Sequence, residues 1–204
     1  MDWILQATAL TQSEFLILIG LAILAGIVRG FSGFALSAMV MATAVIILPP
    51  IELLPMLWWL EMSASILMLK NGWDGADKTM TYALVIGATI GWPIGLALTI
   101  AISVAASKTI ALAVIALLAI TLLAKIRMPF LATKPGLYGS GVLSGIVSGV
   151  AGVGGMVVAV DVLAADAPAQ VLRASLVLYL FRSAGLSMVV SRLAELAKAL
   201  RWVW

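Results

Sequence analysis

The sequence contains no cysteine and no histidine, and only 10% of its 204 residues are charged. Without cysteine, the chain has no disulfide, no thiolate nucleophile and no sulfur ligand for a metal or an iron–sulfur cluster. Without histidine, it lacks the commonest metal ligand and the side chain that usually titrates near neutral pH. In an ordinary soluble domain, roughly a quarter of the residues are charged. We therefore expect no enzyme activity, no catalytic residue, no metal site and no cofactor.

Hydrophobic residues take the place of the missing charge. They make up 64% of the chain, and the mean hydropathy is +1.20. A soluble fold of this length would need far more charge to cover the surface that stays exposed after folding. The net charge of +3 is too small to indicate a nucleic acid partner. The predicted fold class is an all-α polytopic membrane protein whose partners are the lipid bilayer and a small molecule.

Apolar runs divide the chain into about six segments, and a helix needs about 20 apolar residues to cross a bilayer. The first run, 15–48, is too long for one straight span and too short for two. We read it as one crossing by a broken helix, with a re-entrant hairpin as the alternative. The remaining predicted spans are 51–69, 79–100, 107–124, 137–163 and 168–190.

Basic residues in the short loops predict the orientation. If every run crosses once, one side of the membrane carries Lys70, Lys78, Lys125, Arg127, Lys134, Arg192, Lys198 and Arg201. The opposite loops carry only Lys108. We therefore expect a multi-pass protein of the cytoplasmic (inner) membrane with the first side facing the cytoplasm. The tail, 191–204, alternates charged and apolar residues and is expected to be an interfacial helix on the cytoplasmic side.

The two halves of the chain resemble each other. Segment 24–34 aligns with 143–153, with six of eleven residues identical, and the same offset of 119 places Pro49 on Pro168. We interpret this as a duplication that produced two parallel repeats, each opening with a glycine-broken helix. The predicted units are a first repeat of four spans (1–124), a cytoplasmic linker (125–136) and a second repeat (137–204). The second repeat has two spans and the tail, so the last two spans of an eight-span plan are expected to be absent.

Glycine is concentrated in the second repeat. Gly149, Gly152, Gly154 and Gly155 are closer together than helix packing requires. Such a cluster would unwind a membrane helix and turn its backbone N–H groups toward an anion. Two stripes with a spacing of four residues instead favour close helix packing, and they are Gly87, Gly91, Gly95 and Gly141, Gly145, Gly149.

These paired glycine runs, each followed by a proline-bounded helix, resemble the sulfite exporter (TauE/SafE-type) family of membrane anion permeases. Segment 144–155 is close to the family's glycine signature, and segment 25–35 is a looser version without the final glycines. The resemblance spans about 16–191. It implies a permease of about eight spans that exports sulfite, sulfoacetate or a related organosulfonate, and it makes this chain a C-terminally short member.

Charged residues inside the apolar runs complete the predicted site, because a charge within the membrane costs roughly 3 kcal/mol unless it is paired or hydrated. Arg29 lies at the break of the first run, and Arg182 lies within the last. Glu61 is either the charge partner of Arg29 or a coupling residue. Asp161 is expected to be solvated. The predicted substrate-binding residues are Arg29, Gly30, Gly33, Gly149, Gly152, Gly154, Gly155 and Arg182.

The function predicted from these features is a secondary transporter that exports a small sulfur oxyanion. The alternative is a non-transporting or truncated membrane scaffold. The sequence leaves open the substrate, the coupling to protons, and whether the chain forms a homodimer.

Overall fold

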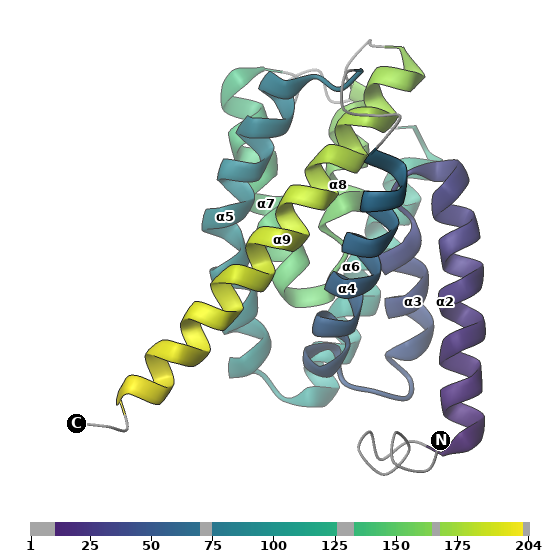
Figure 1. The fold of residues 1–204 in the computed structure, drawn as a ribbon, viewed down its shortest axis with the longest axis vertical. Helices are drawn as coiled ribbons and strands as arrows, with labels where there is room; N and C mark the ends of the chain where they lie inside the picture. The colour runs from purple at the N-terminus through teal and green to yellow at the C-terminus, as the bar shows by residue number, and fades with distance from the viewer. Residues whose placement is uncertain (1–10, 70–74, 126–132, 165–167, 202–204) are drawn as a thin grey trace.

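The computed structural model describes residues 11–69, 75–125, 133–164 and 168–201, which form α-helices and no strand. The helices are α2 (Gln12–Ser32), α3 (Leu36–Ala44), α4 (Pro50–Leu69), α5 (Lys78–Ala101), α6 (Val104–Leu123), α7 (Lys134–Ala151), α8 (Gly154–Ala164) and α9 (Ala169–Arg201). Figure 1 shows them packed as one bundle. Five are long and apolar enough to cross a membrane, namely α2, α4, α5, α6 and the Gln170–Val189 part of α9. The all-α class and the membrane character predicted from the sequence are confirmed at this level.

Local chemistry sets where the helices begin and end. Thr11 and Glu14 form a capping box at the start of α2, and the Asp77 side chain accepts a hydrogen bond from a first-turn amide of α5. Helices α2 and α7 end at Gly33 and Gly152, whose φ angles are 87° and 69°. That left-handed conformation favours glycine, and here it turns the chain sharply at the end of each helix.

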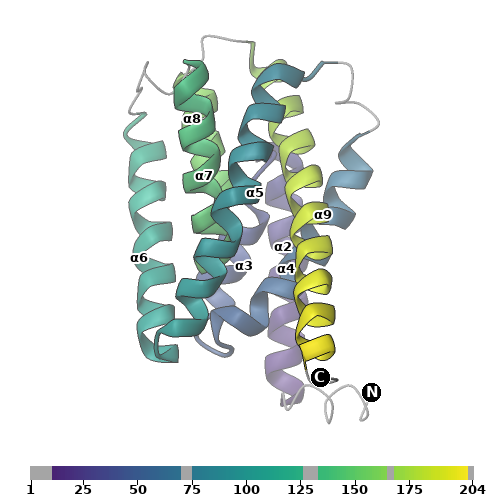
Figure 2. The same cartoon turned by 90° about the vertical axis from the view of Figure 1, so that its left-hand side faces the viewer.

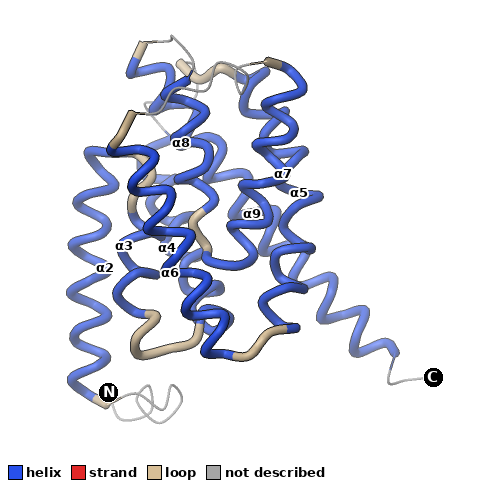
Figure 3. The backbone as a smooth tube through the Cα atoms, turned by 180° about the vertical axis from the view of Figure 1, so that it is seen from behind, coloured by secondary structure: helices blue, strands red, loops and turns tan. Residues whose placement is uncertain are grey.

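Each of these two turns reverses the chain. After Gly33, α3 runs back beside α2, and after Gly152, α8 runs back beside α7 (Figure 3). The Ser140 hydroxyl near the start of α7 donates to Asp161 near the end of α8, as antiparallel helices require. The first apolar run is therefore the hairpin that the sequence left as an alternative. The prediction that 137–163 crosses as one span is wrong, because the left-handed glycine folds it back on itself.

The two hairpins, α2–α3 and α7–α8, run in opposite directions (Figure 1). A Cβ atom added to Gly33 would lie 3.2 Å from Arg173 of α9, and one added to Gly152 would lie 2.6 Å from Leu57 and 3.3 Å from Leu54 of α4. Positions 54 and 173 are themselves 119 residues apart. The sequence predicted parallel repeats, and the antiparallel hairpins depart from that prediction, because the first hairpin returns to its starting end before α4, α5 and α6 run along the bundle.

The same reversal changes where the tail lies. Helices α4 and α6 end, and α5 and α7 begin, at the upper end of the bundle in Figure 1, whereas α9 runs as one helix to Arg201 at the lower end. The sequence placed the basic loops and the tail on the same side. In the structure, the helix ends next to those loops and the last turn of α9 lie at opposite ends of the bundle. The interfacial position of the tail stays a prediction.

Cysteine labelling tests this arrangement, since the natural chain has no cysteine to interfere. Ala105 and Ala124 are exposed residues at the two ends of α6. We expect a membrane-impermeant thiol reagent added to one side of sealed cells to label only one of Ala105→Cys and Ala124→Cys. Ala199→Cys, in the tail, should be labelled together with Ala105→Cys. Labelling of Ala199→Cys together with Ala124→Cys would contradict the reversal at Gly152.

Helices α5 and α7 form the closest helix pair in the bundle and run side by side in the same direction (Figure 2). Both glycine stripes predicted to pack lie in this contact. A Cβ atom added to Gly91 would lie 2.0 Å from the Val142 carbonyl oxygen, and one added to Gly145 would lie 2.4 Å from the Ala88 carbonyl oxygen. The absence of side chains lets the two backbones touch, as small residues do between membrane helices.

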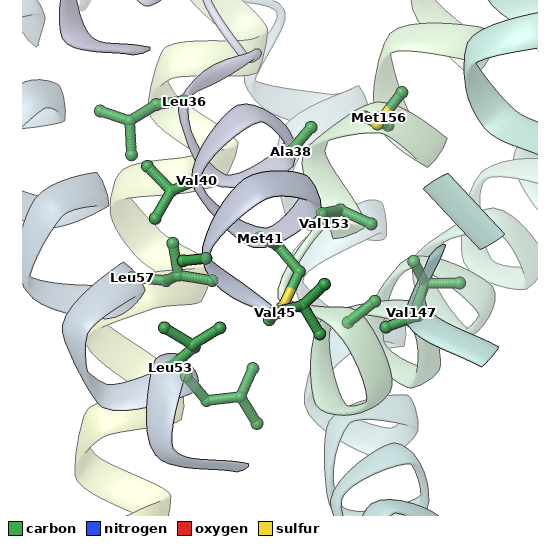
Figure 4. Packing of buried hydrophobic residues seen from close by; sticks show 14 of the residues in the cluster. Leu36, Ala38, Val40, Met41, Val45, Leu53, Leu57, Val147, Val153 and Met156 are labelled. Carbon is green, nitrogen blue, oxygen red and sulfur yellow. The ribbon is translucent and has the colours of Figure 1, made fainter. Parts of the chain in front are cut away.

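A second contact joins α3 and α4 to the second hairpin. Figure 4 shows Met41 of α3 and Val45, which follows α3 directly, among Leu53 and Leu57 of α4 and Val153 beside Gly152. All of these side chains are almost completely buried. This apolar cluster lies beside the glycine turn of the second hairpin, and it fixes the position of that turn between α3 and α4.

Candidate functional site

A small cavity of about 30 Å³ lies between the first hairpin with α4 and the second hairpin with α9. That volume has room for about two water molecules. Its lining residues are Ser37, Trp58, Glu61, Ser148, Gly152, Gly154, Gly155, Leu180, Ser183, Ala184 and Ser187. The cavity therefore receives residues from both halves of the chain, including three of the predicted glycines and Glu61.

Both short helices begin at this cavity. Helix α3 starts at Leu36, directly before Ser37, and α8 starts at Gly154. The first amide groups of a helix have no partner within the helix and carry a partial positive charge. Two helix amino ends of opposite direction thus meet at one site, an arrangement typical of ion and substrate sites in transporters with inverted repeats.

An acidic side chain already occupies the amino end of α3. The backbone N–H of Ser37 donates to Glu61 Oε1 over 3.3 Å, and the Ser37 hydroxyl donates to the same oxygen. The other carboxylate oxygen of Glu61 forms an ion pair with Arg29 Nη1. The carboxylate therefore interacts favourably both with the helix end and with a buried cation.

Arg29 is fully buried, at 0% exposure, but it does not line the cavity. Its Nη2 donates to the Ser65 hydroxyl over 2.7 Å, and its remaining contact is the ion pair with Glu61. Of the two roles that the sequence allowed for Arg29, the structure places it in the structural pair. The pair as a whole is neutral, so it adds no net charge to the cavity.

The amino end of α8 has no such acid. At the offset of 119, Glu61 corresponds to Leu180 and Arg29 corresponds to Ser148, and both of these residues line the cavity. Leu180 packs against Gly155, where an added Cβ atom would lie 2.8 Å from a Leu180 methyl group. An uncharged leucine thus stands beside the start of α8, in the position that a carboxylate takes beside α3.

Hydroxyl and indole donors surround this second helix end. Ser148, Ser183 and Ser187 line the cavity and also a smaller one of about 10 Å³ that continues to Trp92. The Trp92 indole N–H is buried and has no hydrogen-bond partner among the described residues. Its ring packs edge-to-face on Trp58, with 5.6 Å between ring centroids. Sequence reasoning missed these serines, although Ser183 and Ser187, one turn apart in an apolar helix, were a detectable signal.

The remaining predicted site residues lie elsewhere. The Gly30 carbonyl accepts a hydrogen bond from Arg173, and Gly33 forms the turn beside the same arginine. The Gly149 carbonyl accepts from Thr99 of α5 over 3.0 Å. The Arg182 guanidinium lies 4.4 Å from the centre of the Tyr82 ring, a cation–π contact. None of these four predicted residues lines the cavity.

Asp161 differs most from its prediction. It is not solvated but buried in α8, with 1% of its surface exposed. The apolar run 137–163 was read as one span that ended at Asp161 near the outer surface. Because the chain reverses at Gly152, the last turns of that run lie inside the bundle instead.

Comparison of the chain with family models, with curated proteins and with solved structures finds no match. The resemblance to the sulfite exporter family thus depends on the glycine motifs alone.

Proposed function

We propose that this protein is a secondary transporter that exports a small sulfur oxyanion, such as sulfite or an organosulfonate, across the cytoplasmic membrane. One observation carries the proposal. The amino end of α8 opens onto the central cavity among hydrogen-bond donors, and no acidic residue stands in the position that Glu61 takes at α3.

The donors at this site suit an oxyanion. The amino end of α8, the Ser148 hydroxyl and the buried indole N–H of Trp92 are donors that sulfonate or sulfite oxygens can accept from. An anion needs no buried counter-ion at a helix end, because the helix dipole and free amides stabilise it. If the anion crosses without a proton, a membrane potential that is negative inside favours exit of each negative charge by about 2.3 kcal/mol per 100 mV.

The arrangement of the two halves supports a transport cycle. We propose that α2–α4 and α7–α9 descend from one duplicated unit, because their helix ends, glycine turns and turn contacts correspond at one offset. In transporters built from inverted repeats, one unit rocks against the other around a site near the midplane. The cavity between these two units is where such a movement would open and close access.

A substitution at Leu180 tests the anion site. Leu180→Glu places a carboxylate beside the start of α8, as Glu61 stands beside α3. We expect efflux of sulfite and of methanesulfonate from proteoliposomes to fall by at least about tenfold, which corresponds to roughly 1.4 kcal/mol of lost binding. Leu180→Gln introduces a side chain of the same shape as glutamate but without its charge, and this variant should retain most of the efflux.

A double variant separates loss of binding from loss of folding. Ser148→Arg with Leu180→Glu rebuilds in the second half the pair that Arg29 and Glu61 form in the first. The double variant should elute from size exclusion as the parent does and still fail to export anions. Equal efflux by Leu180→Glu and Leu180→Gln would show that the end of α8 is not the anion site.

A non-transporting membrane scaffold is the second candidate, and the small size of the cavity favours it. A volume of about 30 Å³ holds about two waters, so an oxyanion requires the two halves to separate. The two candidates differ in a single measurement. A scaffold gives no flux of any sulfur oxyanion above that of protein-free vesicles, whereas a transporter gives saturable flux.

A further inference from the structure

The second hairpin contains a buried polar cluster that takes no part in lining the cavity. It consists of Ser140 and Ser144 of α7, Asp161 of α8 and Tyr179 of α9, and all four are buried. The Ser140 hydroxyl donates to Asp161 Oδ1 over 2.8 Å. At the offset of 119, Asp161 corresponds to Ala42 and Tyr179 to Leu60, so the first half has no counterpart of this cluster.

Asp161 lacks the partners that Glu61 has. Its second oxygen, Oδ2, is buried and has no hydrogen-bond partner among the described residues. The one ion pair in that part of the chain joins Arg29 to Glu61, not to Asp161. A buried carboxylate without a cation costs several kcal/mol, whereas a neutral carboxylic acid avoids that cost. The carboxyl group is therefore most stable with one proton bound.

Among the described side chains, the helices packed against α8 bring no compensating charge into contact with Asp161. On α9, Tyr179 is the titratable neighbour, Arg173 reaches the Gly30 carbonyl and Arg182 stacks on Tyr82 of α5. On α6, Lys108 reaches the Ile46 carbonyl. Among the side chains that the structure describes, the other titratable groups on or beside these helices are Tyr138 on α7, Asp77 and Lys78 at the start of α5 and Lys125 just after α6, and none of them forms an ion pair or hydrogen bond to Asp161.

Another hydroxyl group of the cluster, that of Ser144, contacts a residue that lines the cavity. Ser144 lies one turn after Ser140 on α7, and its hydroxyl donates to the Gly154 carbonyl oxygen over 2.7 Å. Since that uses the one hydrogen of Ser144, Tyr179 is the donor in the 2.7 Å contact between the two hydroxyls. Gly154 lines the cavity. A change at the start of α8, where an anion would bind, can thus reach Asp161 along α8 itself, and Ser144 links Tyr179 of the same cluster to that helix end.

We propose that Asp161 is the proton-binding site that couples anion movement to proton movement in this protein. The inference rests on the proposed transport function. One proton passes from water on one side of the membrane to Asp161 Oδ2 when the anion binds, and from Oδ2 to water on the other side when the anion leaves. An anion of charge −1 then moves together with one proton, and no net charge crosses.

Proton flux in proteoliposomes gives the first test. The full chain is reconstituted with a pH-sensitive dye inside, and a methanesulfonate gradient is imposed, because this strong acid carries no proton near neutral pH. Wild-type protein should move protons with the anion. Asp161→Asn should lose the proton signal and keep passive anion flux, and Asp77→Asn, an exposed aspartate at the start of α5, should behave as wild type. Unchanged proton movement in Asp161→Asn would overturn the proposal. It would also be overturned if the wild-type anion flux required sodium and Asp161→Asn removed that requirement, because Asp161 would then bind sodium and not a proton.

Infrared spectroscopy gives a second test that needs no substrate. The wild-type protein at neutral pH should show the carbonyl band of a protonated, buried carboxyl group, and Asp161→Asn should lose it. Asp161→Glu should keep a protonated band and the coupling, which covers the case in which the asparagine variant fails to fold. The wild type could show the band, and Asp161→Asn could lose it, while the wild type transports no anion. That result would refute the transport function but would still support Asp161 as a proton-binding site. No protonated band in the wild type would refute the proton site.

Discussion

Arg29→Ala is expected to lower the free energy of unfolding by about 3–5 kcal/mol, because it leaves Glu61 buried without its cation. Ser65 also loses its donor. The variant should show a lower denaturation midpoint in detergent and little membrane-inserted protein. Arg182→Ala serves as the control, because Arg182 is partly exposed and stacks on a tyrosine.

The double variant Arg29→Leu with Glu61→Leu should recover most of that stability. Replacing both members of a buried ion pair by apolar residues is often neutral or stabilising, whereas removal of one member is costly. Export by the double variant then shows whether the pair matters beyond folding, because Glu61 lines the cavity although Arg29 does not. If the double variant is as unstable as Arg29→Ala, the pair stabilises the fold by more than the neutralisation of its two charges. A stable double variant without export would mean that Arg29 or Glu61 acts on the substrate.

Gly145→Ala should destabilise the protein by about 1–3 kcal/mol, as overpacking in a tight contact does. The new methyl group would lie 2.4 Å from the Ala88 carbonyl oxygen and 2.8 Å from the Trp92 backbone nitrogen, so α5 and α7 must move apart. Unfolding in mixed micelles, followed by circular dichroism, measures the change.

Gly139→Ala on the same helix is the matched control. An added Cβ atom there meets nothing within 4 Å. Alanine favours a helix over glycine by up to about 1 kcal/mol, so this variant should be as stable as the wild type or slightly more stable. Equal effects of the two substitutions would mean that the contact between α5 and α7 does not depend on bare glycine.

The sequence was sufficient for the all-α class and for several helix boundaries, and it offered the Arg29–Glu61 pair as one of two alternatives. Helix α2 ends directly before Gly33, and α4 begins directly after Pro49. The pairing of Arg29 with Glu61 follows from the cost of charge in an apolar medium. Three glycines of the second run do line the cavity, because a broken helix exposes its backbone at the break.

The direction of the second half could not be read from hydropathy. A run such as 137–163 has the same composition whether it crosses the membrane or turns back halfway, and only the left-handed φ of Gly152 decides. The same misreading left Asp161 near a surface, whereas the structure buries it inside the bundle. The offset of 119 offered a correction, because a hairpin at Gly33 implies one at Gly152.

The packing of α5 on α7 also constrains how the chain assembles during synthesis. The two helices touch along their glycine stripes, yet α6 and its connections separate them in the sequence. At roughly 5–20 residues per second, the glycine face of α5 spends several seconds in lipid before α7 is made. Membrane helices insert first and associate afterwards, so the glycine face of α5 contacts lipid while α6 is inserted, until α7 packs against it. The halves of the molecule join late, and the cavity between them forms only once the second hairpin has been made.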